Sequence, residues 1–549
     1  MNLPPKHNET VLAYHERTKH HIDRYARGPA HINWNAKPES YRRYAGTKRF
    51  ELALAADSLT SAYVNLYRPK AITPQPLILN KVAALLELSL GISAWKQYEN
   101  ERWALRCNPS SGNLHPTEGY VILPSIGGIP SGVYHYLSED HVLEHRGILG
   151  ASGIANLDNV LSQNHFLIGL SSIPWREMWK YGERAFRYCQ HDIGHAIAAI
   201  RYAAATLGWK VVLLEHWADI EIGATLGLDQ VDDFHDNEPE IPEVMLCISA
   251  NDKPKRVLGS AITSAIINIT WAGKANVLDT NHHYKWPLVD TVLNATTKPR
   301  TKETNWSPPP MPAILPLATN RRAANLIRQR RSAQMFDSVT QLSTKMFYRL
   351  LDSTLPRQDA APWDVLRRRP HLHLILFVHR VTDISPGMYI LLRRAGIEDE
   401  LHAALQREHF DWIKQPGCPK HLQFYQIVSG DAKTVAQQIC CHQEIAADSA
   451  FSLGMLAEFQ NGLQIGAWGY KQLLWEAGIL GQVLYLEAEA IGVRGTGIGC
   501  YFDDVFHSLL GLIGTRYQSM YHFSIGTPPQ DKHLQTFPPY AHLKRGKGR

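Results

Sequence analysis

An internal repeat constrains this fold more than any other feature of the sequence. Residues 187–228 and 471–512 align without a gap at a constant offset of 284, and seven aligned pairs are identical. The identical pairs are Gly194 and Gly478, Ala204 and Ala488, Gly208 and Gly492, Asp219 and Asp503, and the Leu-Gly-Leu triplets at 226–228 and 510–512. Because self-similarity at one spacing is the signature of a duplicated unit, the chain is predicted to fold as two related halves.

Each copy of the repeat predicts a long helix, a short strand and a second helix. Apolar residues recur every three or four positions in the first part of both copies, which is the spacing of a buried helical face. Gly208 and Gly492 follow these runs and are predicted to end the helices, since glycine readily adopts the left-handed conformation found there. A strand and a helix that ends at Leu-Gly-Leu should follow in each half.

Short apolar runs elsewhere predict the strands. They lie at 120–123, 166–170 and 244–248 in the first half and at 372–378 and 522–525 in the second, and a turn followed by Gly-apolar-Tyr occurs at 132–134 and at 387–389. Together with the long helices they predict an α+β fold, with helices packed around mixed sheets. We expect the two halves to pair within one chain as an intramolecular pseudo-dimer.

A proline-rich segment separates the halves. Residues 306–312 read Trp-Ser-Pro-Pro-Pro-Met-Pro, and each proline fixes φ and removes a backbone donor, which disfavours helix and central strand alike. The 549 residues fit two large domains. The predicted parts are a first domain at 1–296 with a loop-rich arm at 29–50, a linker at 297–318, a second domain at 319–530 and a basic tail at 531–549, whose last residues, 544–549, are expected to be a solvated end.

Composition argues against several classes of protein. Hydrophobic residues make up 44% of the chain, yet no apolar run reaches the roughly 18–20 residues of a membrane span, and the polar first residues do not resemble a secretory signal. The seven scattered cysteines favour a reducing compartment over a disulfide scaffold. The net charge of +6 is mild for this length. A cytoplasmic protein with no membrane and no nucleic-acid partner is expected.

A polar, turn-forming loop stands directly before one of the predicted strands. It contains Pro109, Ser110, Ser111, Gly112 and Asn113, so that two hydroxyls and an amide lie beside a glycine. Such a loop can lie flat against a planar heterocycle and hydrogen-bond to its edge. The alternative is a tight loop whose side chains cap their own turns.

A basic segment follows the linker. Arg330, Arg331 and Ser332 place two guanidinium groups beside a hydroxyl, and arginine forks match phosphate oxygens in a bidentate manner. The alternative is the solvated basic end of a helix. Arg494 is a weaker phosphate candidate, because an arginine at a helix end is also typical of a charge that pairs with the helix dipole.

Taken together, these segments resemble the FMN-dependent nitroreductase family. Two further segments, at 179–188 and 192–195, are similar more specifically to its azoline-dehydrogenase branch of the SagB/ThcOx type. The resemblance rests on Pro-Ser-Ser-Gly-Asn at 109–113, Arg-Arg-Ser at 330–332, Gly-Thr-Gly-Ile-Gly-Cys at 495–500, Trp-Lys-Tyr-Gly-Glu-Arg at 179–184 and Asp-Ile-Gly-His at 192–195.

The resemblance covers most of residues 10–260 and 320–527 and implies a tandem fusion with FMN bound between the halves. At the place of the Pro-Ser-Ser loop the second half has only the residues 355–359, so one FMN site is expected to be complete and the other degraded. The cofactor-binding residues that the resemblance implies are Pro109, Ser110, Ser111 and Asn113 of the first half and Arg330, Arg331, Ser332, Gly497 and, more weakly, Arg494 of the second.

The resemblance also implies a catalytic pair, Lys180 and Tyr181. Turning an azoline into an azole transfers a hydride to the flavin and a proton to a base. A desolvated lysine has a lowered pKa that suits it to accept this proton, and a tyrosine can relay or orient it. The alternative is a surface lysine beside a core tyrosine.

The expected function is FMN-dependent dehydrogenation of azoline-type or related heterocycles, carried by a small molecule or a peptide. One alternative is a nitro or quinone reductase that uses NAD(P)H. A second alternative, of another class, is a partner subunit of a peptide-modifying complex in which a flavin is structural or absent.

A pair of histidines leaves one more alternative. His191 and His195 share a helical face at the spacing of a zinc site. Asp192 replaces the glutamate base of the zinc-protease pattern and no third ligand is evident nearby, so a zinc hydrolase is only an alternative and no metal is expected. Cys440 and Cys441 are a weak metal signal as well, because adjacent cysteines cannot easily face one ion.

Overall fold

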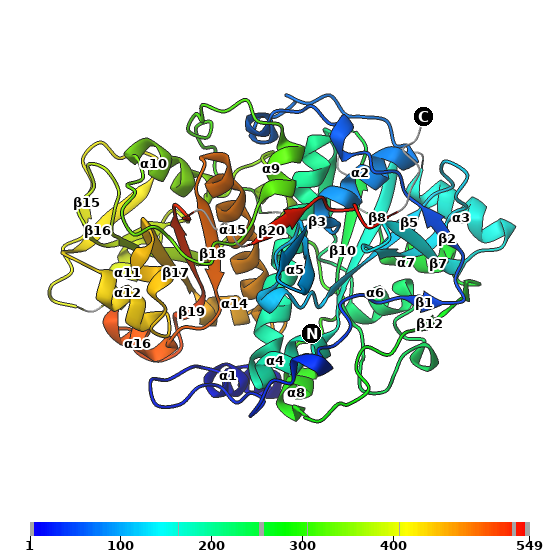
Figure 1. Ribbon diagram of the computed structural model, residues 1–549, viewed down its shortest axis with the longest axis horizontal. Coiled ribbons are helices and arrows are strands. Elements are labelled where there is room, and N and C mark those ends of the chain that lie inside the picture. The colour runs from blue at the N-terminus through cyan, green and yellow to red at the C-terminus, as the bar shows by residue number, and fades with distance from the viewer. Residues whose placement is uncertain are drawn as a thin grey trace.

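The computed structural model describes residues 5–162, 164–251, 257–304, 306–405, 407–529 and 534–543. Each half of the chain builds one large sheet, and helices cover both sheets (Figure 1). This confirms the predicted α+β fold. Within the described ranges, no helix is both long and apolar enough to cross a membrane.

The first sheet has the strand order β11-β7-β6-β5-β8-β10-β9, with β2 added against β7. All three runs that predicted strands in the first half lie in it, within β5, β8 and β10. The bounds are Arg49–Glu51 for β2, Thr117–Leu123 for β5, Gly132–Leu137 for β6, Val142–Ile148 for β7, His165–Ser172 for β8, Lys210–Leu213 for β9, Ile241–Ser249 for β10 and Thr270–Trp271 for β11.

The second sheet has the order β15-β16-β14-β13-β17-β19-β18. Its core strands β13 and β19 contain the two apolar runs predicted in this half. The bounds are Leu372–Val378 for β13, Gly387–Leu392 for β14, Ile413–Lys414 for β15, Gln423–Ser429 for β16, Phe451–Ala457 for β17, Arg494–Ile498 for β18 and Gln518–Gly526 for β19.

The prediction of mixed sheets is wrong for the strands that the structure describes. Every pairing between neighbouring strands of the two large sheets is antiparallel. The reason lies in the strand order: β10 is inserted between β8 and β9, and it pairs antiparallel with both. The helical connection from β8 to β9 therefore joins two strands that do not touch.

The repeat forms the elements that its residues predict. The long helices are α5 (Ala185–Thr206) and α15 (Gly469–Ala490), and their bounds keep the offset of 284. Gly208 and Gly492 follow them with φ of 71° and 86°. The strands β9 and β18 and the helices α6 (Asp219–Leu226) and α16 (Asp503–Leu509) then come in the predicted order.

The two long helices cross at equivalent glycines. A Cβ atom on Gly194 would lie 2.2 Å from the carbonyl oxygen of Trp475, and one on Gly478 would lie 2.2 Å from that of His191. Because no side chain fits there, the backbones of α5 and α15 approach directly. One continuous core of buried apolar residues then runs through both halves.

Two ion pairs link the halves in an equivalent manner. Arg187 of α5 lies 3.2 Å from Asp503 at the start of α16, and Lys471 of α15 lies 3.1 Å from Asp219 at the start of α6. All four side chains are buried. Arg187 and Lys471 are related by the offset of 284, as are Asp219 and Asp503, so the halves are related across their interface as well as in sequence.

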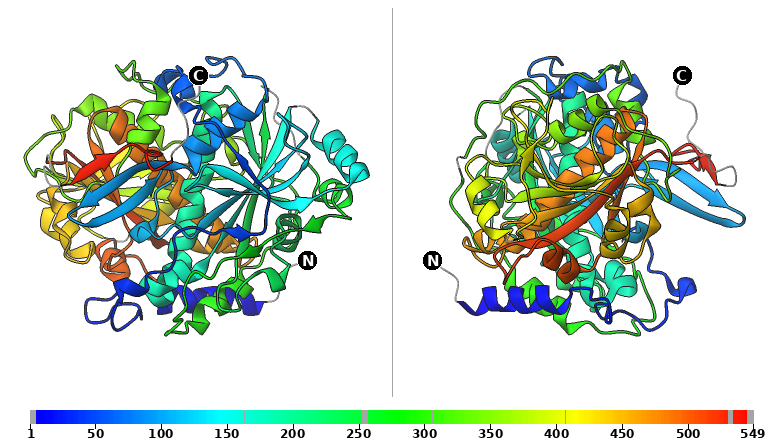
Figure 2. Two further views of the ribbon diagram at one scale, coloured as in Figure 1. Left: turned by 45° about the vertical axis from the view of Figure 1, so that its right-hand side comes forward. Right: turned by 90° about the vertical axis from the view of Figure 1, so that its left-hand side faces the viewer.

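Part of the predicted basic tail at 531–549 packs against the first half. Strand β20 (Gln535–Phe537) pairs with β3 (Ile92–Tyr98), which in turn pairs with β4 (Glu101–Arg106). Tyr540 is buried and accepts a hydrogen bond from the Ile92 amide. This three-stranded sheet projects from the body of the protein (Figure 2, right). The basic residues 544–549 lie outside the described residues.

The connecting segments pack against the body. The described residues of the predicted linker at 297–318 contain no helix or strand, and the backbone of Leu315 is held by Asp352 and Arg349. The predicted arm at 29–50 is mostly loop, with β1 (Tyr44–Ala45) and the start of β2. The domain boundaries themselves stay a prediction.

Candidate functional site

A large cavity lies where the two halves meet. Its volume is about 1400 Å³. The first half contributes the loop at 106–115, Tyr181, and the face of α5 that carries Tyr188, Asp192 and His195. The second half contributes the segment 329–335 and the strand β18 with the residues around it, and the projecting sheet adds Lys96, Trp103 and Thr536.

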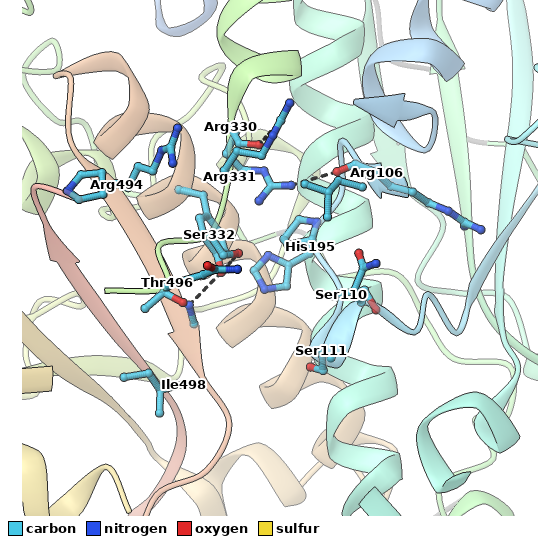
Figure 3. A pocket seen from close by; sticks show the side chains of 18 of the residues that line it. Arg106, Ser110, Ser111, His195, Arg330, Arg331, Ser332, Arg494, Thr496 and Ile498 are labelled. Carbon is cyan, nitrogen blue, oxygen red and sulfur yellow. Dashed lines mark hydrogen bonds between the residues drawn. The ribbon is translucent and has the colours of Figure 1, made fainter. Parts of the chain in front are cut away.

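Arginines gather at one end of this cavity. Arg330, Arg331 and Arg494 all line it, across the cavity from Ser110 and Ser111 (Figure 3). Burial, followed by the neighbouring Arg330 charge, lowers the pKa of Arg331 to about 10. Arg330 and Arg331 donate to backbone carbonyls, and no hydrogen bond or ion pair joins the Arg494 guanidinium to another described residue. This end therefore favours an anion.

The arginine segment is held in place by strand β18. Ser332 forms a parallel bridge with Gly495, and the Ala333 amide donates to the Gly495 carbonyl at 2.9 Å. The Tyr485 hydroxyl of α15 lies 2.9 Å from the Ser332 hydroxyl and accepts a hydrogen bond from the Gly497 amide. The segment 330–332 and β18, which contains Gly495 and Gly497, are far apart in the sequence and together form one wall of the cavity.

The three alternating glycines of this strand make room for aromatic rings. An added Cβ would lie 2.4 Å from Phe523 at Gly495, 1.8 Å from the Tyr521 hydroxyl at Gly497 and 2.4 Å from Tyr188 at Gly499. Since the Gly497 N–H already donates to Tyr485, the amide of this predicted cofactor-binding residue is occupied. Its contribution is to let Tyr521 pack closely.

The opposite wall is the Pro-Ser-Ser loop. Gly112 and Asn113 have φ of 60° and 57°, which turns the chain sharply. The Asn113 amide donates to the Ala104 carbonyl, and its oxygen lies 2.9 Å from His115 Nε2. The Ser110 hydroxyl accepts from the His115 amide at 2.8 Å. The side chains of the loop therefore hold its own turns, as the alternative predicts, and the loop also lines the cavity, while its contact with a heterocycle stays a prediction.

Two buried carboxyl groups lie behind this loop. Asp192 Oδ1 of α5 accepts a hydrogen bond from the Ser111 amide at 3.2 Å, and its Oδ2 is buried without a hydrogen-bond partner among the described residues. Burial raises the pKa of Asp192 to about 7. Glu177, on α4 (Pro174–Tyr181), is buried nearby, and both burial and the Asp192 charge raise its pKa. Neither Glu177 oxygen has a hydrogen-bond partner among the described residues.

The predicted catalytic pair flanks the same loop. A Cβ on Gly112 would lie 2.6 Å from the Tyr181 hydroxyl and 3.2 Å from Lys180 Nζ. Tyr181 lines the cavity, whereas Lys180 is not among its lining residues and its Nζ lies 5.2 Å from the ring centroid of Trp34. Burial lowers the pKa of Lys180, which the Glu177 charge opposes. Burial raises that of Tyr181.

The histidines of the zinc alternative face different partners. His191 Nε2 lies 3.0 Å from the Met520 carbonyl oxygen, and His195 Nε2 lies 3.4 Å from the Tyr521 hydroxyl. Burial lowers the pKa of both imidazoles. In the described parts of the chain, neither histidine belongs to a group of three side chains placed to hold a metal ion.

The position equivalent to the cavity in the other half is filled. Residues 213, 214 and 215 correspond to residues 497, 498 and 499 by the offset of 284, and they line a space of only about 10 Å³. Lys210, the counterpart of Arg494, lies 3.5 Å from Asp364. Arg201, the counterpart of Tyr485, lies 2.7 Å from the same carboxylate. A carboxylate of the protein lies within ion-pair distance of both cations here, whereas no described carboxylate lies within that distance of Arg494.

Sequence reasoning missed the roles of several lining residues. The sequence analysis considered Asp192 and His195 only for the resemblance and for the zinc alternative, and nothing in the sequence places Glu177 beside Asp192 or Tyr485 beside Ser332. The signal that could have identified Asp192 is an acidic residue directly before the largely apolar run 193–207, which predicts a buried helix.

Comparisons with known proteins agree with this architecture. The trifolitoxin-processing protein TfxB of Rhizobium leguminosarum bv. trifolii is 29% identical over 194 residues, which are 32% of this chain and 52% of that protein. A protein of Methanocaldococcus jannaschii that is provisionally named a nitroreductase is 27% identical over 168 residues, 28% of this chain and 77% of that one. The chain thus spans about half the length of TfxB. A scan against protein-family models finds no match.

One solved structure matches almost the whole chain. It is a protein of Anabaena variabilis, also provisionally named a nitroreductase, with a TM-score of 0.67 at 19% identity over 95% of this chain and 99% of that one. The fold is therefore that of this protein in both halves. With the two sequence relatives, it confirms the predicted resemblance to the nitroreductase family.

Proposed function

We propose that this chain is an FMN-dependent oxidoreductase that binds one FMN between its halves. The observation that carries the proposal is the arginine end of the cavity. Arg330, Arg331 and Arg494 line it, while the nearby Glu489 carboxylate lies 3.7 Å from Arg321. Glu489 also lines this end and its charge interacts with Arg494, but one carboxylate does not balance the three arginines, and the phosphate of FMN supplies further negative charge that suits guanidinium groups.

The remaining walls fit the other parts of FMN. The Ser110–Asn113 loop lies across the cavity from β18, whose Thr496 and Ile498 line it (Figure 3), so that a flat ring has a wall on either side. The volume of about 1400 Å³ exceeds the roughly 300–1000 Å³ of typical small-molecule sites, which leaves room for a substrate beside the cofactor.

Bound FMN supplies the acceptor for a hydride, and the chain handles the proton. Asp192, with a pKa of about 7, can take up or release a proton near neutral pH. The charge of Asp192 interacts with that of Glu177, and Asp192 hydrogen-bonds to the amide of Ser111. Gly112, the next residue of the loop, lies beside the Tyr181 hydroxyl and Lys180 Nζ. These four groups form a proton-holding cluster directly behind the Pro-Ser-Ser loop.

As the substrate we propose an azoline or related heterocycle within a peptide. Support comes from TfxB, which is named for processing trifolitoxin and is similar over 194 residues, and from the Lys180-Tyr181 pair beside the loop. The Lys180→Ala variant should keep FMN and lose heterocycle oxidation. The Tyr181→Phe variant keeps the aromatic ring and removes only the hydroxyl, so it tests the role of the hydroxyl alone.

Binding of FMN and of riboflavin tests the cofactor assignment. Apoprotein should take up one FMN per chain and bind riboflavin more weakly, because riboflavin lacks the phosphate. Replacing Arg494 by Ala should weaken FMN binding about tenfold to a hundredfold, the value of one hydrogen bond to a charged group, and leave riboflavin binding unchanged. Arg516→Ala, at an exposed ion pair, is the matched control. Equal binding of both flavins by the wild type contradicts the proposal.

Flavin absorbance separates the proposed dehydrogenase from its alternatives. Anaerobic mixing with an azoline-containing peptide should bleach the flavin, whereas NADH should not. Rapid bleaching by NADH alone identifies a reductase of nitro compounds or quinones. Holoprotein that responds to neither, yet co-purifies with a peptide-cyclising enzyme, identifies a partner subunit.

A further inference from the structure

Two cysteines from distant parts of the second half meet at the wall of the cavity. The sulfur atoms of Cys441 and Cys500 lie 2.7 Å apart, about 0.7 Å longer than a disulfide bond. Both side chains are half-buried, and Cys500 lines the cavity directly after the glycine strand. The pair takes no part in the function proposed above.

The backbone turns Cys441 toward Cys500 and its neighbour away. Cys441 and His442 have φ of 53° and 60°, in the left-handed region. Cys440 is fully buried, and its sulfur faces His522 Nδ1 at 3.9 Å. Adjacent cysteines thus point to different places, and the strained turn brings only the second of them to Cys500.

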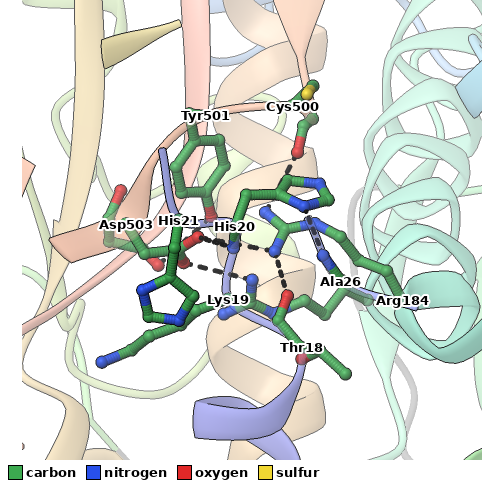
Figure 4. A network of polar contacts seen from close by, with 12 residues as sticks. Thr18, Lys19, His20, His21, Ala26, Arg184, Cys500, Tyr501 and Asp503 are labelled. Carbon is green, nitrogen blue, oxygen red and sulfur yellow. Dashed lines mark hydrogen bonds and ion pairs between the residues drawn. The ribbon is translucent and has the colours of Figure 1, made fainter. Parts of the chain in front are cut away.

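The surroundings of Cys500 favour its thiolate. A hydrogen bond joins the two sulfur atoms, and this contact, opposed by burial and aided by the Arg184 charge, lowers the pKa of Cys500. The pKa of Cys441 is raised. Arg184 is fixed by Asp503 and by the Thr18 and Gly499 carbonyls (Figure 4). One thiol is thus prepared to attack and the other to resolve.

A metal does not account for this pair. In the described ranges, the groups of three side chains placed to hold an ion are His235, Glu238 and His282, and Glu16, His21 and Asp504. Neither includes a cysteine. The arrangement of two thiols without a third ligand is that of a dithiol–disulfide couple.

We propose that Cys441 and Cys500 form a reversible disulfide that carries two electrons between the cavity and a small disulfide from solution. The part that concerns the cavity rests on the proposed FMN site. The thiol chemistry itself does not depend on it.

The electrons and atoms balance in two stages. The Cys500 thiolate attacks one sulfur of an external disulfide and releases one thiol; Cys441 loses its proton, attacks the Cys500 sulfur of the mixed disulfide and releases the second thiol. The Cys441–Cys500 disulfide then takes up two electrons and two protons from the reduced flavin and returns to the dithiol. The net reaction oxidises the flavin and reduces the external disulfide to two thiols.

Thiol mapping tests the couple without any flavin. The full-length apoprotein is incubated with oxidised glutathione, alkylated and digested without reduction, and its peptides are identified by mass spectrometry. Two of the seven thiols should disappear, with Cys441 and Cys500 joined in one cross-linked peptide. Cys418→Ser, at the other half-buried cysteine, should keep the cross-link, and Cys500→Ser should lose it. A wild type that shows only a glutathione adduct on Cys418, or a cross-link to Cys440, overturns the proposal.

Anaerobic titration with dithionite tests the link to the cavity. Oxidised holoprotein should consume four electrons per flavin, and Cys441→Ser should consume two. Electron exchange between flavin and disulfide is supported if the wild type consumes four electrons and its cross-link disappears before the flavin bleaches or together with it. A wild type that consumes two electrons while its cross-link persists overturns it. Protein that binds no FMN refutes the proposed function, and the thiol map still decides the couple.

Discussion

The buried carboxyl behind the Pro-Ser-Ser loop should make this protein less stable as the pH rises. Burial raises the pKa of Asp192 from 3.8 to about 7. Between these values the folded chain holds a proton that the unfolded chain has released, so unfolding releases a proton and the free energy of unfolding falls with increasing pH. Below pH 4 both states are protonated and the carboxyl has no effect.

The magnitude follows from the width of that interval. One pKa unit corresponds to about 1.4 kcal/mol, so the full effect is on the order of 4 kcal/mol, of which about 2 to 3 kcal/mol falls between pH 5 and pH 8. An asparagine in place of Asp192 keeps an oxygen for the Ser111 amide and removes the ionisation. The Asp192→Asn variant should therefore gain stability over the wild type as the pH rises.

Urea unfolding at pH 5, 6, 7 and 8 measures this difference. The gap between Asp192→Asn and the wild type should widen by about 2 to 3 kcal/mol from pH 5 to pH 8. Asp399→Asn, at an exposed position of α11 (Glu398–Ala404), is the matched control and should follow the wild type. Parallel curves for Asp192→Asn and the wild type would falsify the assignment of a raised pKa to this residue.

Two further predictions concern the contact between the halves. Gly478→Ala should lower the midpoint of thermal unfolding by the equivalent of about 1–3 kcal/mol, because its Cβ would lie 2.2 Å from a backbone carbonyl, whereas Gly223→Ala, with 3.5 Å to its nearest neighbour, should be neutral or stabilising by up to about 1 kcal/mol. Similar midpoints for both variants contradict the direct helix contact. Lys471→Met should cost about 3–5 kcal/mol at neutral pH, because it leaves Asp219 and Glu243 buried without their cation. Adding Asp219→Asn and Glu243→Gln should restore most of that stability, and no recovery contradicts the ion-pair account.

The repeat made much of the fold predictable, because it combines two independent signals. Apolar spacing identified α5 and α15 as buried helices, and the aligned glycines placed their ends. The strands followed from short apolar runs, yet the strand order did not, since the insertion of β10 between β8 and β9 depends on contacts distant in the sequence. The charge of residues 544–549 obscured the apolar segment just before them, which adds a strand to the first half.

The same limit, that local sequence does not encode distant contacts, applied to the residues of the site. Residues whose role shows in a local motif, such as Ser110 and Arg331, were found and do line one cavity. Residues that are distinguished by their burial between the halves were not found from the sequence, and Asp192 and Glu177 are the main examples. The unusual pKa of Asp192 comes from desolvation by both halves, which no local spacing encodes.

The asymmetry of the two equivalent positions supports the proposal that the duplicated chain binds one FMN. Arg494 and its counterpart Lys210 occupy the same place in β18 and β9, yet Asp364 lies beside Lys210 and no described carboxylate pairs with Arg494. An anion entering the filled position would have to displace Asp364 from both Lys210 and Arg201, and about 10 Å³ of space offers no compensating contacts. The second half instead supplies one wall of the open cavity, which is formed by α15 and β18. Removing the Asp364 charge therefore exposes two cations without creating a second FMN site, and an Asp364→Asn variant should still bind one FMN per chain.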